Sequence, residues 1–177
     1  MTTQEQFIKT VLPYAQAAES KYKVPALVAM ARSALETGWG KNAPGNMYFG
    51  IKASKKWTGK KQLLTTTEFH DTPDVQYPVI INIEKVKIKV NGKEKEVYKY
   101  KVKDYFRAYD SPQGSFDDFG KFLNENARYK NAFQFSDPVL FTKEIVKAGY
   151  STASNTFETL QVLIQQIKKK AEQLQLL

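Results

Sequence analysis

Cysteine is absent from this sequence, and histidine occurs once, as His70. The chain therefore forms no disulfide, offers no thiolate nucleophile and lacks the Cys and His sets that zinc centres require. A Ser-His-Asp catalytic site would have to use His70. We expect neither a cofactor nor a resident metal ion.

Arginine is also scarce. Only three of the 27 Lys and Arg residues are arginine, and the 18 Asp and Glu residues leave a net charge of +9. Proteins that read nucleic acids rely on Arg for bidentate contacts with bases and phosphates, so we do not expect nucleic acid as a partner. A lysine-dominated surface favours a diffuse anionic polymer, or it is simply a solvated basic surface.

Long apolar runs are missing as well. No stretch approaches the roughly 20 residues that a membrane-spanning helix needs. The first residues also lack the basic segment and apolar stretch of a secretory signal peptide. We therefore expect no membrane span, and either a mature chain or one that leaves its cell by lysis or a dedicated delivery route.

Hydrophobic periodicity indicates helices at both ends of the chain and strands between them. Helical spacing of apolar residues covers 4–20, 25–38, 115–123, 137–149 and 155–174. We expect Pro13 to kink the first helix or divide it in two, Gly38 to end the second, and Ser115 to cap the third. With 42% apolar residues in 177, this pattern predicts one α+β domain, 1–177, that is mainly helical and monomeric.

Residues 63–109 have the character of strands and predict a small antiparallel β lobe inserted between the helical parts. Val86, Ile88 and Val90 alternate with lysines, and the pair Asn91-Gly92 that follows is typical of a type I′ hairpin turn. Alternation places Lys85, Lys87 and Lys89 together on one face of this hairpin. We expect the apolar face to pack on the lobe.

Glu36 is the most unusual acid in the chain. It lies in the last turn of an apolar helix, where a negative charge is unfavourable, just before Gly38-Trp39-Gly40. We expect this carboxyl to be partly shielded from water, which favours the protonated form that general acid catalysis needs near neutral pH. A Glu that points into solvent at the helix end is the alternative.

Glu68, in the strand region, is the second candidate acid. A carboxylate across a cleft from Glu36 would complete the acid and base pair of a glycosidase. The local sequence favours the alternative, in which Glu68 is an exposed strand residue paired with a lysine.

Several aromatic rings and one amide surround the loop after Glu36. The residues are Trp39, Asn46, Tyr48, Phe49 and Trp57. Sugar rings have apolar faces that pack on aromatic planes, and an amide can hydrogen-bond hydroxyl or N-acetyl groups. The rings are therefore candidates for substrate binding, with an ordinary core as the alternative.

A series of short segments resembles glycoside hydrolase family 73, in the order found in that family. The segments are ARSALETGWG (31–40), GNMYFGIK (45–52), WTGK (57–60), TTEF (66–69), YFRAYDS (105–111) and AGYST (148–152). The resemblance covers nearly the whole chain. It implies a lysozyme-like fold with a helical body, a small β lobe and a cleft between them, and β-N-acetylglucosaminidase action on peptidoglycan.

The resemblance also implies roles for individual residues. Glu36 matches the family's general acid, Glu68 the β-lobe carboxylate proposed as its second catalytic residue, and Tyr150 a tyrosine of the cleft. Tyr109 lies in a matching segment and joins the candidate substrate-binding residues. The stretch 70–103 is longer than usual for the family and holds the lysine-rich hairpin.

The sequence thus predicts a hydrolase of the bacterial cell wall that cleaves the β-1,4 bond between N-acetylglucosamine and N-acetylmuramic acid. Glu36 would protonate the glycosidic oxygen, and water would attack with Glu68 as base or with help from the substrate's N-acetyl group. One alternative is a lytic transglycosylase, which uses one acid and no water. Another is a non-catalytic wall-binding module that kept the fold.

Overall fold

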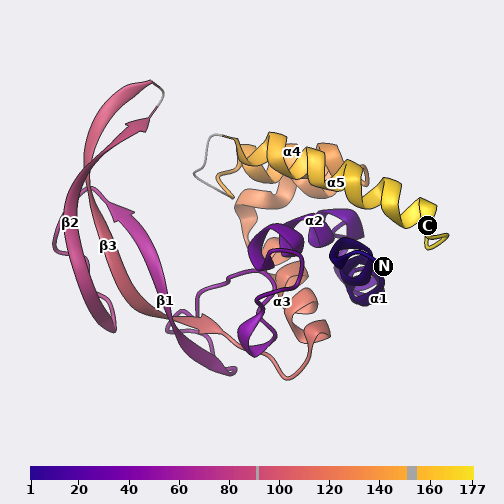
Figure 1. Ribbon diagram of the computed structural model, residues 1–177, viewed down its shortest axis with the longest axis horizontal. Coiled ribbons are helices and arrows are strands. Elements are labelled where there is room, and N and C mark those ends of the chain that lie inside the picture. The colour runs from indigo at the N-terminus through magenta and orange to yellow at the C-terminus, as the bar shows by residue number, and fades with distance from the viewer. Residues whose placement is uncertain (91, 151–154) are drawn as a thin grey trace. The chain divides into compact units, whose positions relative to one another are not determined.

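The computed structural model describes residues 1–90, 92–150 and 155–177 (Figure 1). The chain divides into two compact units, one made of Met1–Gly50 with Tyr109–Leu177 and the other of Ile51–Ala108. The described residues of the first unit hold the α-helices, and those of the second hold the strands. The α+β class, mainly helical, is thereby confirmed. That both units form one domain, 1–177, stays a prediction.

The first unit begins with two helices, α1 (Thr3–Tyr22) and α2 (Ala26–Thr37). Thr2 and Glu5 form a capping box at the start of α1. The expected division of this helix at Pro13 is wrong, because α1 continues through it. Because Pro13 has no N–H, the carbonyl of Lys9 lacks its helix hydrogen bond. Both residues lie on the exposed face of α1, where water can replace this bond.

The C-terminal part of this unit contains three further helices and a 3-10 segment. These are α3 (Pro112–Glu125), η2 (Ala127–Gln134), α4 (Pro138–Lys147) and α5 (Thr156–Gln173). Asp137 caps α4, since its side chain accepts hydrogen bonds from the N–H groups of Val139 and Leu140. The described chain has no helix long and apolar enough to cross a membrane.

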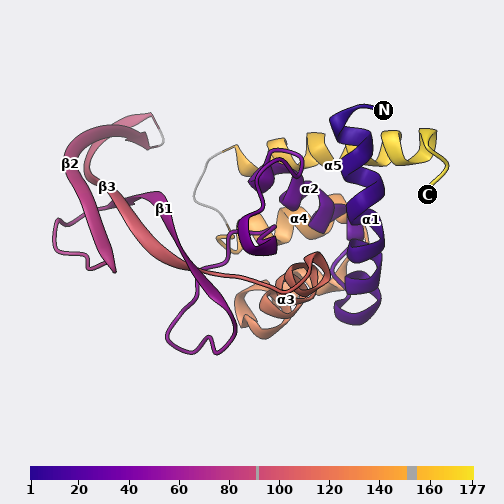
Figure 2. The same ribbon diagram turned by 60° about the horizontal axis from the view of Figure 1, so that its bottom comes forward.

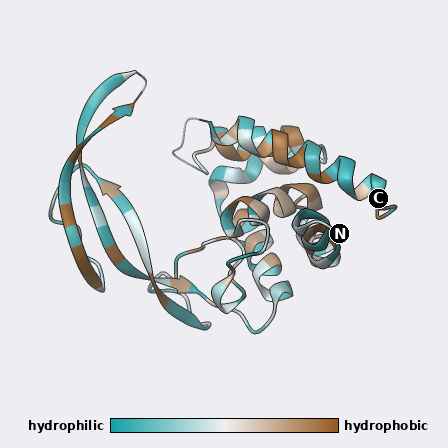
Figure 3. Cartoon of the chain, viewed as in Figure 1, coloured by the Kyte–Doolittle hydropathy of each residue, from teal (hydrophilic) through white to brown (hydrophobic). Residues whose placement is uncertain are grey.

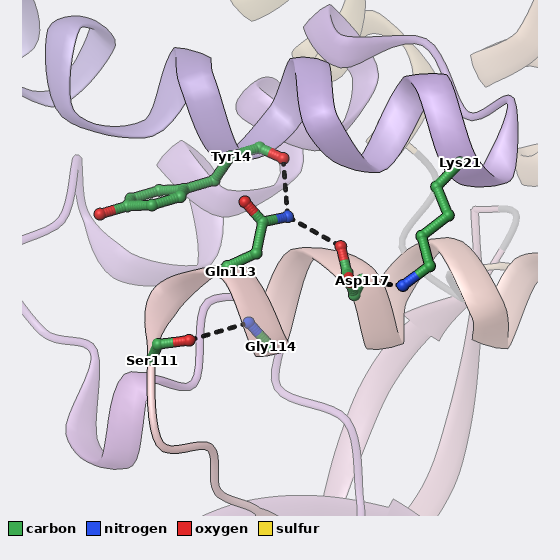
Figure 4. A network of polar contacts seen from close by, with 6 residues as sticks. All are labelled: Tyr14, Lys21, Ser111, Gln113, Gly114 and Asp117. Atoms are coloured by element: carbon green, nitrogen blue, oxygen red, sulfur yellow. Dashed lines mark hydrogen bonds and ion pairs between the residues drawn. The ribbon is translucent and has the colours of Figure 1, made fainter.

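The predicted cap of α3 is wrong. Ser111 caps the helix and accepts a hydrogen bond from the Gly114 N–H (Figure 4). Pro112 follows at the first helical position, which its fixed φ and missing N–H suit. Ser115 is fully buried inside the helix, where its Oγ accepts a 3.0 Å hydrogen bond from the Tyr48 N–H. It therefore ties the loop before Gly50 to α3.

Polar contacts join α1 to α3 (Figure 4). The Gln113 amide donates to the Tyr14 carbonyl at 3.3 Å and to Asp117 Oδ1 at 2.7 Å. Lys21 pairs with Asp117 at 3.0 Å. In the same unit, Phe49 stacks on Phe119 of α3, with their ring centroids 4.1 Å apart. These contacts fix the helices against which the loop over residues 44–50 packs.

The second unit is built on one antiparallel sheet in the order β1-β3-β2 (Figure 2). The strands are β1 (Lys61–His70), β2 (Val79–Val90) and β3 (Lys93–Arg107). The predicted hairpin of β2 and β3 is confirmed by a register that runs to Val90 opposite Lys93. Gly92 has φ +77°, as a tight turn requires, while Asn91 lies outside the described residues, so the turn type stays a prediction.

The two faces of β2 differ from the expectation. Val86 and Ile88 are only half-buried and Val90 is exposed, so the apolar face does not pack closely on the lobe. At the hydrophobic start of β2 (Figure 3), four apolar side chains, those of Val79, Ile80, Ile81 and Ile83, are 37–49% exposed. Lysines of the opposite face form ion pairs across the hairpin, Lys85 with Glu96 at 2.7 Å and Lys87 with Glu94 at 3.5 Å.

Candidate active site

Glu36 lies in the last turn of α2, as the sequence predicts, and α2 ends at Gly38 with φ +58°. Its side chain is 36% exposed, so the carboxyl is shielded from water only in part. This position at the end of the helix leaves the carboxyl at the surface. The buried member of the site is Arg32, one turn earlier, which is 9% exposed and whose Nη2 donates a hydrogen bond to Glu36 Oε1.

Tyr150 completes a cluster with Arg32 and Glu36. The guanidinium carbon of Arg32 lies 4.8 Å from the centroid of the Tyr150 ring. The same ring packs against Tyr129, with centroids 5.8 Å apart, and the Tyr150 N–H donates to the Ile145 carbonyl. The structure therefore brings together two predicted catalytic residues, Glu36 and Tyr150, through an arginine that the sequence analysis missed.

The charges in this cluster follow from its burial. Burial raises the pKa of the Tyr150 hydroxyl, and the nearby Arg32 only partly offsets this effect. Burial alone would lower the pKa of Arg32, but contacts with Tyr150 and Glu36 outweigh it and the pKa is raised. At neutral pH the cluster thus contains a permanent cation and a neutral phenol next to the carboxyl of Glu36.

The segment GNMYFGIK passes directly beside Glu36. Gly50 has φ +59°, and a Cβ atom added there would lie 3.4 Å from Glu36 Oε2. A side chain at this position would be strained by the positive φ, and its Cβ would contact the carboxyl. The ring of Phe49 is buried and stacked on Phe119, which favours the core alternative for this residue. Phe49 therefore positions Gly50 from within the core.

The side chain of Asn46 is hydrogen-bonded to the backbone of Tyr109. The Asn46 side-chain amide donates to the Tyr109 carbonyl at 3.0 Å, and the Tyr109 N–H donates to the Gly45 carbonyl at 2.8 Å. The Tyr109 hydroxyl donates to Asp118 at 2.6 Å. In this structure both polar side chains serve internal bonds that shape the loop before Tyr48.

Trp39 and Tyr48 line one cavity of about 450 Å³ in the first unit. This volume is within the usual range of small-ligand pockets, roughly 300–1,000 Å³. Trp39 is half-buried, has φ +63°, and packs edge-on against Phe7 with ring centroids 5.6 Å apart. Gln6 and Lys41 add polar groups to the wall. An aromatic ring beside amide and ammonium donors suits a carbohydrate ligand.

Glu68 belongs to a second cluster, in the other unit. Lys52 Nζ lies 2.8 Å from Glu68 Oε1 and 3.0 Å from Asp104 Oδ2. Burial by itself lowers the pKa of Lys52, but its hydrogen bonds to Glu68 and Asp104 outweigh this and raise it. Sequence analysis missed Asp104, whose proximity to Glu68 depends on the register of β1 and β3. Pairing of Glu68 with Glu36 stays a prediction.

Trp57 also lies in the second unit. Its indole N–H donates to the Lys60 carbonyl at 2.8 Å, and the Arg107 guanidinium lies 4.4 Å from its ring centroid. Ser151 and Thr152, the last residues of the AGYST segment, lie outside the described residues. No cluster of three or more Asp, Glu or His that could hold a metal ion occurs in the described part of the chain.

Comparison with known proteins agrees with this architecture. Residues 12–169 match the Glucosaminidase family, described as mannosyl-glycoprotein endo-beta-N-acetylglucosaminidase. The peptidoglycan hydrolase FlgJ of Vibrio parahaemolyticus is 34% identical over 175 residues, which cover 95% of this chain and 47% of that protein. The chain therefore spans about half the length of this curated relative.

Solved structures show the same fold. The glycoside hydrolase domain of FlgJ from Salmonella typhimurium, truncated at its C-terminus, matches with a TM-score of 0.69 and 28% identity, covering 94% of this chain and 98% of that one. A mutant peptidoglycan hydrolase from Sphingomonas sp. A1 matches with a TM-score of 0.68 and 26% identity, covering 96% and 99%. With its lysozyme-like α+β fold, the chain belongs to the glucosaminidase family of glycoside hydrolases, as the resemblance of its segments indicates.

Proposed function

We propose that this chain is a peptidoglycan hydrolase that cleaves the β-1,4 bond between N-acetylglucosamine and N-acetylmuramic acid. The observation that carries the proposal is the partly exposed Glu36 carboxyl, held at the end of α2 by buried Arg32 inside the span that matches the family. Similar proteins named peptidoglycan hydrolases support the choice of substrate. The site of action would be the bacterial cell wall.

In the proposed reaction, Glu36 donates a proton to the glycosidic oxygen as the bond breaks. An oxocarbenium-like centre then forms at the sugar, and water attacks it. Glu68 acts as the base, or the substrate's N-acetyl group assists. Asp104 shares Lys52 with Glu68 and is a second carboxylate beside that candidate base. Tyr150, neutral at working pH, provides a hydroxyl rather than a charge next to the acid.

Substrate binding is proposed for aromatic side chains of both units. Trp39 and Tyr48 line the cavity of the first unit and would pack against sugar faces. Trp57, stacked by Arg107, would do the same in the second unit. The contribution of Asn46, Phe49 and Tyr109 would be indirect, since their hydrogen bonds and packing shape the loop that leads to Gly50.

The products of wall digestion test this proposal. Purified sacculi are digested, the fragments are reduced with borohydride, and their ends are identified by mass spectrometry, with Glu36→Gln as the control. We expect reduced N-acetylglucosamine ends, and only with the wild-type protein. Reduced N-acetylmuramic acid ends would assign the other glycosidic bond. Anhydro ends, lighter by one water, would indicate a lytic transglycosylase. Binding without any product would indicate a non-catalytic module.

A further inference from the structure

We propose that Arg32 is a positioning residue that holds the Glu36 carboxyl in one orientation at the end of α2. The inference rests on the proposed function in treating Glu36 as the acid. It concerns a residue that touches no substrate and acts only through Glu36.

The packing of Arg32 leaves its buried positive charge few possible counter-charges. The side chain is 9% exposed, with one face of the guanidinium against the Tyr150 ring at 4.8 Å. Its Nε is buried and has no hydrogen-bond partner among the described residues. A buried cation needs a counter-charge, and Glu36 is the carboxylate in contact with it. The pair is therefore fixed from the arginine side, whose stacking on Tyr150 prevents it from following Glu36 into solvent.

This arrangement also orients the carboxyl. Arg32 Nη2 binds Glu36 Oε1, while Oε2 lies beside Gly50, where the missing Cβ leaves it room. One oxygen is thus occupied by the arginine, and the other faces a backbone segment without a side chain. We infer that Oε2 carries the proton that is transferred.

Two variants separate charge from geometry. Arg32→Gln removes the charge and keeps an amide donor, whereas Arg32→Lys keeps the charge and loses the planar group that stacks on Tyr150. Arg128→Gln is the matched control, since Arg128 is exposed, stands 5.5 Å from the Tyr129 ring, and gives the same change in net charge.

The contact is followed directly by NMR of the Glu36 side-chain carboxyl carbon at one pH, which requires no activity. We expect its chemical shift to change in Arg32→Gln and to stay at the wild-type value in Arg128→Gln. An unchanged chemical shift in a folded Arg32→Gln protein overturns the inference, whether or not the chain cleaves peptidoglycan.

Turnover gives the second readout. In Arg32→Lys we expect KM to stay near the wild-type value while kcat falls about 10- to 100-fold, because misplacement of a catalytic group by about 1 Å has that effect. Wild-type kcat in Arg32→Lys overturns the positioning role, and this variant decides the question should Arg32→Gln not fold. Failure of the proposed function is distinguishable, since it appears as absent glucosaminyl ends with the wild-type protein.

Discussion

Ser115→Ala should destabilise the helical unit, although it removes only one buried hydroxyl. The Ser115 Oγ accepts the Tyr48 N–H at 3.0 Å from inside α3, and alanine leaves that donor without this acceptor. An unsatisfied donor of this kind costs about 1–3 kcal/mol. Since the bond is only partly buried, we expect the lower part of that range, about 1–2 kcal/mol.

For a chain of this size, each kcal/mol lowers the melting temperature by about 2–4 °C, so the expected drop is about 2–8 °C. Thermal unfolding followed by circular dichroism measures it. Ser33→Ala is the matched control, because Ser33 is also fully buried but donates only to the Met30 carbonyl of its own helix. We expect less than about 1 kcal/mol from that change. Equal melting temperatures for the two variants would refute the role assigned to Ser115.

Three further predictions concern the second unit and the half-buried Tyr150. Glu68→Gln should lower turnover on sacculi less than Glu36→Gln does, since N-acetyl assistance can replace a base. If added azide rescues Glu68→Ala and yields an α-glycosyl azide, Glu68 is the base of an inverting enzyme. Unimpaired turnover in both Glu68 variants would remove this residue from the mechanism. Replacing Lys85, Lys87 and Lys89 with Gln should weaken sacculus binding at low salt and make binding less dependent on salt. Exposed ammonium groups attract polyanions at long range, and salt screens this attraction. Binding equal to that of the parent protein at low salt would show that these lysines only keep the strand soluble. Burial raises the pKa of Tyr150 in the folded chain, so the folded state holds this proton more tightly than the unfolded state does, and the free energy of unfolding should fall as pH rises above about 10. Chemical denaturation at pH 8 and above pH 10 measures this fall, which should be smaller in Tyr150→Phe than in the wild-type protein. An equal fall in the two proteins would contradict the assignment.

Features that depend on neighbouring residues could be predicted from the sequence. The helical spacing before Gly38 placed Glu36 in a last turn, and alternation in β2 predicted the hairpin with β3. The cap of α3 shows the limit of local patterns. Ser115 with Asp118 imitates a capping box, but Pro112 suits the first helical position and moves the start of the helix to Ser111.

Features that depend on distant contacts could not be predicted. Tyr150, from the turn that follows α4, packs on the guanidinium of the buried Arg32. Asp104 reaches Lys52 only through the pairing of β3 with its neighbours. Burial of Phe49 depends on Phe119 from α3. In each case the sequence shows the residue type, but the residue's contacts depend on tertiary packing.

The most direct measurement compares the wild-type protein with Glu36→Gln on the same purified sacculi, by the rate at which new reducing ends are released. Glu125→Gln serves as the control, since it makes the same change at the exposed end of α3. General acid catalysis contributes about 10²–10⁴-fold, so Glu36→Gln should lose at least about 10²-fold in rate while it unfolds at the wild-type temperature and Glu125→Gln keeps its activity. A folded Glu36→Gln protein that retains more than about a tenth of the wild-type rate would contradict the assignment of Glu36 as the acid.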